Sequence, residues 1–157
     1  MGKFTEPVAG PFSIASLVIL IGGLIGIIAV FLNWFDWTES TILGKFSITY
    51  NGFDFAFSDD FKNVDDFQRY CPFIAWLLIL LAFVAALLPV FNVKVIDEKI
   101  TYIIVAVFGL LALIFVIMFM TWNDVNDHLA IGVYLGLISA ILVMVGGALP
   151  VVEQFTK

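Results

Sequence analysis

The chain has 157 residues, of which 62% are hydrophobic and 13% are charged, and its mean hydropathy is +1.11. Soluble globular domains contain about 45–50% apolar and about 25% charged residues. A soluble domain of this length cannot hide so much apolar surface, so the composition excludes that class and indicates an integral membrane protein.

Four charge-free apolar runs are each long enough to cross a bilayer. A transmembrane helix needs about 20 apolar residues to span about 30 Å of hydrocarbon. The first run is longer than the apolar region of a signal peptide, and bulky residues follow it instead of a cleavage site, so we expect it to be retained. The sequence predicts a mainly α-helical, integral membrane four-transmembrane-helix bundle, one domain over 1–157, with spans at about 12–32, 72–91, 100–120 and 129–149.

The charges of the connecting segments predict the orientation of the chain. The segments 33–71 and 121–128 share one side of the membrane and carry nine acidic and three basic residues, whereas the other side carries four of each. Lys and Arg in short segments favour the cytoplasmic side. We therefore expect both termini in the cytoplasm and the segments 33–71 and 121–128 on the extracellular side of the cell membrane.

We expect the external segment 33–71 to form a small antiparallel β-sheet. Asn51-Gly52, between alternating residues, is a strong signal for a two-residue type I′ hairpin turn. A strand at about 35–43 that turns at Gly44 would add a third strand to this hairpin. The turn at 51–52 places alternate side chains on one apolar face. The predicted interaction surface consists of that face and one upstream tryptophan: Trp37, Phe46, Ile48, Tyr50, Phe53, Phe55 and Phe57.

A short external helix is predicted over about 59–70. Apolar residues recur there at a spacing of three, and two acid–base pairs, Lys62–Asp66 and Asp65–Arg69, lie four residues apart. Carboxylates are ligands that Ca²⁺ prefers, but their spacing matches no EF-hand loop. Solvated acids near a helix start explain them more simply, so we predict no metal site and no cofactor. The weak metal candidates are Asp54, Asp59, Asp60, Asp65 and Asp66.

Small residues recur within the spans at spacings that permit close helix packing. The first span contains Gly22-x-x-x-Gly26, and the fourth contains Gly132-x-x-x-Gly136-x-x-x-Ala140. We expect these two spans to be close neighbours. None of the four apolar runs contains Asp, Glu, Lys, Arg or His, which argues against a proton relay, a carrier of charged substrates or a voltage sensor.

The run "FLNWFDW … FSITYNGFDF", followed by a Gly-rich last span, resembles a broad set of uncharacterised prokaryotic four-span membrane proteins, a likeness that implies no activity. The layout is also similar to the claudin/PMP22-like tetraspan group, in which a large first external loop holds a β-sheet and a short helix. Trp34, Gly52-Phe53 and Arg69 fall at places comparable to that group's motifs. Asp54 stands where the group has a second Trp, and the paired loop cysteines are missing. This resemblance implies an adhesion-like role.

Two classes of function remain open. In the first, the protein is non-enzymatic, and its extracellular β-domain contacts another membrane or extracellular protein or a second copy of the chain. In the second, it is an oligomeric channel or a small-solute or cation transporter with an acidic external vestibule. The sequence contains no nucleophile–base set, no phosphate-binding loop and no basic patch, so we expect neither an enzyme nor a nucleic-acid partner. Membrane lipid is the remaining expected partner.

Overall fold

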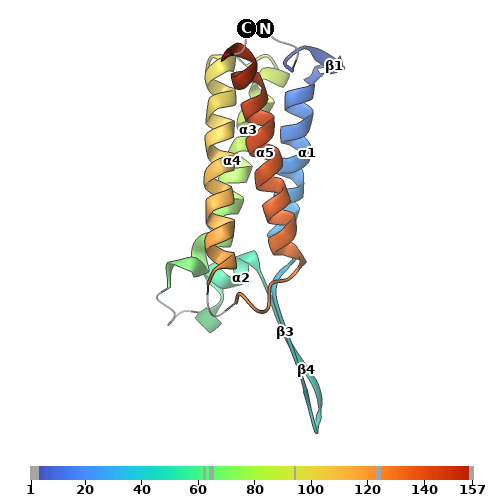
Figure 1. The fold of residues 1–157 in the computed structure, drawn as a ribbon, viewed down its shortest axis with the longest axis vertical. Helices are drawn as coiled ribbons and strands as arrows, with labels where there is room; N and C mark the ends of the chain where they lie inside the picture. The colour runs from blue at the N-terminus through green and yellow to red at the C-terminus, as the bar shows by residue number, and fades with distance from the viewer. Residues whose placement is uncertain (1–3, 62, 64–65, 94, 123–124, 156–157) are drawn as a thin grey trace.

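The computed structural model describes residues 4–61, 63, 66–93, 95–122 and 125–155. Four helices form an elongated bundle, with both chain ends close together at one end and a β-hairpin projecting from the other end (Figure 1). The bundle helices are α1 (Ile14–Ala29), α3 (Cys71–Val90), α4 (Glu98–Met120) and α5 (Ile131–Phe155). Two antiparallel pairs of strands complete the chain, β1 (Pro7–Ala9) with β2 (Phe12–Ser13) and β3 (Asn33–Thr41) with β4 (Gly44–Asn51).

Three of the four bundle helices are long and apolar enough to cross a membrane, over Phe67–Val90, Glu98–Met120 and Ile131–Glu153. The first predicted span is shorter than expected, because α1 has 16 residues instead of the predicted run 12–32. At its start, Phe12–Ser13 pairs with β1 and the Ser13 side chain accepts a hydrogen bond from the Ser16 N–H. At its end, the chain extends into β3 at Asn33.

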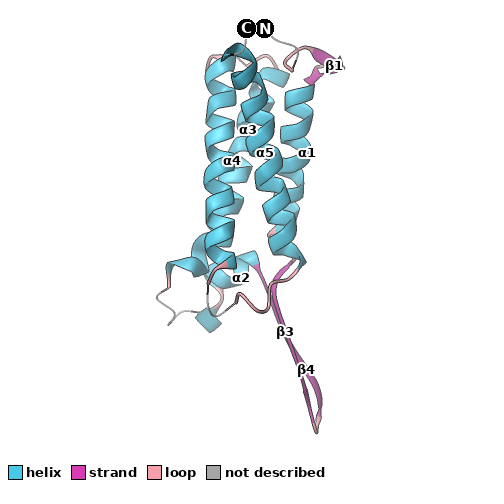
Figure 2. Ribbon diagram, in the orientation of Figure 1, coloured by secondary structure: helices cyan, strands magenta, loops and turns pink. Residues whose placement is uncertain are grey.

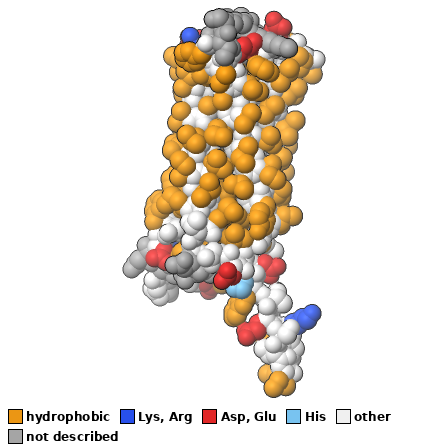
Figure 3. All heavy atoms as spheres, in the orientation of Figure 1, with side chains coloured by type: hydrophobic (Ala, Val, Ile, Leu, Met, Phe, Trp, Pro, Cys, Tyr) orange, Lys and Arg blue, Asp and Glu red, His pale blue; other side chains and the backbone are white. Residues whose placement is uncertain are grey.

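The sides and the ends of the bundle differ sharply in chemistry. Hydrophobic side chains cover the visible flank of the bundle, and charged side chains gather at its two ends and on the hairpin (Figure 3). Exposed aliphatic residues of the bundle helices include Leu24, Val107 and Ile138, at 53%, 46% and 46% exposure. Apolar groups exposed on this scale are stable in lipid and costly in water.

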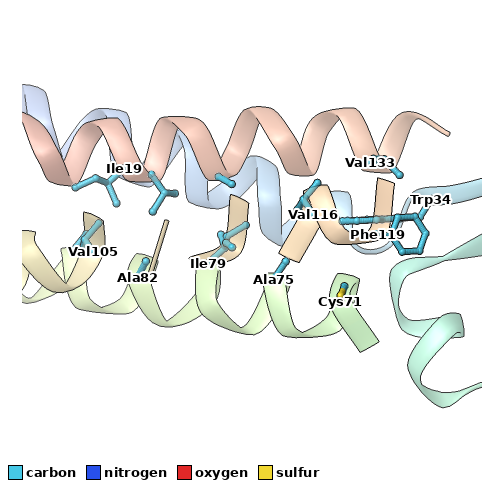
Figure 4. Packing of buried hydrophobic residues seen from close by; sticks show 14 of the residues in the cluster. Ile19, Trp34, Cys71, Ala75, Ile79, Ala82, Val105, Val116, Phe119 and Val133 are labelled. Atoms are coloured by element: carbon cyan, nitrogen blue, oxygen red, sulfur yellow. The ribbon is translucent and has the colours of Figure 1, made fainter. Parts of the chain in front are cut away.

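The interior of the bundle is filled by side chains from all four helices (Figure 4). Ile19, Ile79, Val105 and Val143 are at most 2% exposed. Trp34 and Phe119 close the end that faces the hairpin, with ring centroids 5.4 Å apart in an edge-to-face arrangement. The indole N–H of Trp34 donates to the carbonyl oxygen of Ala29 at 2.8 Å.

The glycines predicted to permit close helix packing make two different kinds of contact. Gly22 and Gly26 lie against α5, where a methyl group on Gly22 would be 2.6 Å from Cβ of Leu142. The Ser139 hydroxyl donates to the Gly22 carbonyl oxygen at 2.6 Å, which adds a polar bond between α1 and α5. The fully buried Ala140 follows on α5.

Gly132 and Gly136, in contrast, accommodate a tryptophan. A methyl group on Gly132 would lie 2.5 Å from Cδ1 of Trp34, and one on Gly136 would lie 3.0 Å from its Cη2. These two glycines therefore make room for the side chain that enters from β3, and the closest α1 contacts come from further along α5.

The type I′ turn predicted at Asn51-Gly52 is wrong. Asn51 ends β4 and caps the short helix α2 (Gly52–Phe57), because its side chain accepts a hydrogen bond from the Asp54 N–H at 2.9 Å. The Asp54 carboxylate accepts in turn from the Asn51 N–H at 2.9 Å, which completes a reciprocal capping box. The cross-strand pairs predicted between 46–50 and 53–57 therefore do not form. The hairpin turns one strand earlier, at 42–43 (Figure 2).

The helix predicted over 59–70 is also wrong as a continuous element. The described part contains two short 3₁₀ helices, η1 (Asp59–Phe61) and η2 (Phe67–Tyr70). Lys62, Val64 and Asp65, which contributed to the predicted helix, lie outside the described residues. The guanidinium of Arg69 points into α2 and η1, and its predicted partner Asp65 lies outside the described residues.

Candidate interaction surface

The β3–β4 hairpin, which we call the arm, has one apolar and one polar face. In its register Phe35 pairs with Tyr50, Trp37 with Ile48 and Glu39 with Phe46. Because alternate residues of a strand point to opposite faces, these six side chains share one face. Four of them lie beyond the base of the arm and are exposed: the acidic Glu39 and three apolar side chains, Trp37 at 38%, Ile48 at 41% and Phe46 at 56%.

The opposite face of the arm is polar along its whole length. Asp36 pairs with Thr49, Thr38 with Ser47 and Ser40 with Lys45. This alternation is typical of antiparallel strands that bury one face against other groups and expose the other face to water. On its apolar face, Phe35 and Tyr50 pack at the base and Trp37 contacts the His128 ring, whereas Phe46 and Ile48 are left exposed.

Among the described residues, the tip of the arm is the most exposed apolar part. Ile42 and Leu43 are 105% and 90% exposed. Gly44 follows with a φ of +127°, a conformation that residues with a side chain rarely adopt. The Thr41 hydroxyl donates to the Gly44 carbonyl oxygen at 2.9 Å and closes the turn. The sequence predicted a turn at Gly44. The two aliphatic residues before it were not part of the predicted interaction surface.

The base of the arm is fixed to the α4–α5 connection. The Asp36 N–H donates to the His128 carbonyl oxygen at 3.0 Å, and the Ala130 N–H donates to the Trp34 carbonyl oxygen at 3.1 Å. Phe35 forms a bridge with Leu129 between these two bonds. The segment 128–130 therefore pairs with the base of β3 from its outer edge. The third strand predicted for this sheet is replaced by this short pairing from a distant part of the chain.

His128 also contributes its side chain to the base. Its ring lies edge-on to Phe35 and Trp37, with centroid distances of 5.4 and 6.2 Å. These contacts orient Trp37, the first exposed tryptophan of the arm. They also explain the position of the His128 ring, which needs no metal ion to hold it.

Behind the base, aromatic side chains form a packed platform. Phe55 of α2 is 1% exposed and contacts Phe61, Phe119 and Trp122 at centroid distances of 4.7, 5.1 and 5.9 Å. Tyr50 lies on the same group at 5.7 Å from Phe55. The platform joins the last residues of β4 to the ends of the bundle helices, so the arm leaves the bundle from a rigid support.

Two carboxylates hold the edge of this platform. The Tyr50 hydroxyl donates to Asp60 at 3.2 Å, and the Trp122 indole N–H donates to Asp66 at 3.0 Å. Burial, followed by the charge and the hydrogen bond of Asp60, raises the pKa of Tyr50 above its usual value. The carboxylates thus act as acceptors for aromatic donors.

Arg69 holds α2 and η1 together from below. It lies in η2, just before α3, and is 6% exposed. Its Nε and Nη2 donate to the carbonyl oxygens of Phe55 and Ala56 at 3.2 and 3.1 Å, and its Nη1 donates to that of Phe61. A cation at the C-terminal end of a helix is favourable because the unpaired carbonyl groups carry negative partial charge. Sequence reasoning named this residue as a helical ion-pair member and as a position comparable to a motif of the claudin/PMP22-like group, and it missed these contacts.

The predicted interaction surface is therefore divided among three places. Trp37, Phe46 and Ile48 lie on the exposed face of the arm, whereas Tyr50 and Phe55 belong to the platform. Phe53 and Phe57 belong instead to a third aromatic group, where they contact a ring just after α1 and rings of α3. The partners in that group are Phe31, Phe73 and Trp76, at centroid distances of 5.0–6.0 Å.

The acidic residues considered for a metal ion are separated by these roles. Asp54 caps α2, Asp60 accepts from Tyr50, and Asp66 accepts from Trp122. Asp59 begins η1, and Asp65 lies outside the described residues. Within the described part of the chain, no three His, Cys, Asp or Glu side chains come together in a way that would hold a metal ion.

The chain matches no model of a known protein family, no curated protein and no solved structure. The resemblance to claudin-like tetraspan proteins consequently rests on the sequence features named above. The fold itself places the chain among helical proteins with apolar helices long enough to cross a membrane.

Proposed function

We propose that this chain is a non-enzymatic integral membrane protein whose arm, on the extracellular side, makes protein–protein contacts. The observation that carries the proposal is the exposed apolar face of the arm, formed by Trp37, Phe46 and Ile48. The arm extends beyond the end of the bundle, away from the apolar flank that suits lipid (Figure 3). A protein partner is the environment that suits such a face at this distance from the bundle.

The physical argument rests on the stability of the arm. A two-stranded hairpin is marginal in water unless its apolar face packs against something. Covering the remaining exposed surface of the three side chains would contribute roughly 3 kcal/mol, since full burial of one large apolar side chain is worth about 1.5–3 kcal/mol. A contact of that size orders the arm and links its folding to binding.

The membrane placement is part of the proposal. The helix α1 would be the fourth span, although its 16 residues reach only about 24 Å. The apolar residues on either side of it, and local thinning of the bilayer, supply the rest of the crossing. With four spans, both termini lie on one side of the membrane, and the distribution of Lys and Arg favours the cytoplasm for that side. The arm then lies outside the cell.

The filled interior of the bundle bears on the alternative function. Ile19, Ile79 and Val105 point into it (Figure 4), and Val143 is fully buried. A channel would consequently have to form between several chains, and no described feature favours it over protein contact.

Photo-crosslinking in native membranes tests the proposal. A photoreactive phenylalanine analogue replaces Phe46 on the apolar face, and the matched control carries it at Ser40 on the polar face near the same height. We expect protein adducts, with another protein or with a second copy, from position 46 and few from position 40. Adducts with lipid alone, or equal protein adducts from both positions, would contradict the proposed role.

A further inference from the structure

The two edges of the arm are not equivalent. The outer edge of β3 is paired at its base with the segment 128–130. The outer edge of β4 forms no ladder with any described residue, because the sheet consists of β3 and β4 alone. Unpaired edge groups are a template for pairing with another strand. Among the described residues, β3 is paired with the segment 128–130 at its base, whereas β4 is the strand whose outer edge is open along its whole length.

The charges distinguish the edges in the same way. The strand β3 carries two acidic residues, Asp36 and Glu39, and β4 carries one charge, Lys45. Two β3 strands from separate copies would bring carboxylates together, which is unfavourable. Two β4 strands bring no acids into contact.

We propose that β4 pairs antiparallel with β4 of a second copy, in the register that sets Ser47 opposite Ser47. This inference rests on the proposed function and names the partner. The register sets Phe46 opposite Ile48 of the second copy and Gly44 opposite Tyr50, so seven residues of each strand are paired. Both apolar faces then lie on the same side of one four-stranded sheet, because each residue faces another of equal parity.

This register also gives charge complementarity. It places Lys45 opposite Thr49 of the second copy, and Thr49 is paired within its own arm to Asp36. The Lys45 and Asp36 positions of different copies are then two strands apart, about 10 Å, on the same polar face. A lysine side chain extends far enough to bring its ammonium group near that carboxylate. The two-fold symmetry of the pair makes this contact twice, as expected for an isologous interface.

The antiparallel direction has a consequence for the bundles. Each arm continues beyond the end of its own bundle (Figure 1). Two arms that pair antiparallel point in opposite directions, so the bundles lie at opposite ends of the shared sheet. The second copy therefore belongs to a facing membrane, and the paired arms bridge the gap between the two membranes.

Disulfide trapping tests both the register and the facing arrangement. Ser47→Cys is made in a Cys71→Ala background and is compared with Thr38→Cys, which lies across from Ser47 on the same polar face but on β3. Each full-length variant is reconstituted, under two different tags, into two separate populations of phosphatidylcholine vesicles, and these are mixed before oxidation. Because a disulfide needs Cβ atoms about 4 Å apart, we expect at least about tenfold more mixed-tag dimer from Ser47→Cys than from Thr38→Cys.

Four results would overturn the inference. Equal dimer from the two variants rejects the β4 edge, and dimer only between copies of the same vesicle rejects the facing arrangement. Absence of dimer, together with adducts from position 46 to a different protein, rejects the second copy but leaves the proposed protein-contact function intact. If neither the dimer nor protein adducts form, both the pairing with a second copy and the proposed protein-contact function are rejected.

A charge exchange provides an independent check of the register. We expect Lys45→Glu to lower the yield of the Ser47→Cys dimer about two- to fivefold, the range for an exposed ion pair. Adding Asp36→Lys restores the opposite charges, and we expect the yield to recover. A double variant that falls below the single one would contradict the proposed register.

Discussion

Replacement of Arg69 by Met should release α2 from its support while leaving the bundle folded. The methionine fills much of the space of the arginine stem but donates nothing to the carbonyl oxygens of Phe55, Ala56 and Phe61. A buried acceptor left without a donor costs about 1–3 kcal/mol. Because water reaches the part-buried Phe61 carbonyl, we expect a total loss of about 2–5 kcal/mol in the local stability of 52–61.

Amide hydrogen exchange in detergent micelles measures this loss directly. The Ser58 N–H, which donates to Asp54 at 2.9 Å, reports on α2. A loss of 2–5 kcal/mol corresponds to exchange at least about 30-fold faster. Arg69→Lys, which keeps the charge but cannot bond three carbonyls at once, should give a smaller acceleration. Equal exchange in Arg69→Met and the wild type, or equal acceleration of amides in the middle of α5, would refute this account of Arg69.

Three further changes test the packing and the base of the arm. Ser139→Ala removes the hydrogen bond to the Gly22 carbonyl oxygen, and we expect it to lower the free energy of unfolding in detergent by about 0.6 kcal/mol, the average for such bonds in a membrane; an unchanged unfolding midpoint would count against that bond. Gly132→Ala places a methyl group 2.5 Å from Cδ1 of Trp34 and should lower it by about 1–3 kcal/mol, seen as a lower thermal midpoint. Tyr50→Phe tests stability at alkaline pH. The raised pKa of Tyr50 means that the folded state holds the phenol proton more tightly than the unfolded state does. The stability that Tyr50 gains in this way is present below pH 10.0 and is lost as pH rises through the folded pKa. A plot of stability against pH should therefore fall less steeply above pH 10.0 for the variant than for the wild type.

The apolar helices were predictable from sequence because their lengths and compositions leave few alternatives. An uncharged run of about 20 residues is stable as a helix in lipid, where every backbone group must be paired internally. The shortening of α1 was less visible, since Phe12 is as apolar as the residues that follow it. The signal was Ser13, which can cap a helix only from outside its first turn.

The error at Asn51-Gly52 has a physical cause that the sequence also contained. Asn followed by Gly suits a type I′ turn, but Asn is equally a preferred helix cap. Asp54, three residues later, completes the reciprocal cap, and this decides between the two conformations. Gly44 was the true turn residue of the hairpin, and its φ of +127° shows why glycine stands there.

The remaining parts of the candidate surface depend on contacts between distant segments. The pairing of Asp36 with His128 and the reach of Arg69 to Phe55 join residues that no local pattern relates. The predicted apolar face was divided for the same reason, because α2 turns Phe55 into the platform. Sequence reasoning located the arm and half of its apolar residues, whereas its support came from tertiary contacts.

Accessibility of single cysteines in intact cells tests the central claim most directly. Leu43→Cys lies at the tip of the arm, and Asn92→Cys lies between α3 and α4, at the end of the bundle that holds the termini. Both variants carry Cys71→Ala and are treated with a maleimide that cannot cross membranes. The account predicts that Leu43→Cys reacts in intact cells and that Asn92→Cys reacts only after the cells are permeabilised. The reverse pattern, or reaction of both cysteines in intact cells, would contradict a membrane bundle with an external arm.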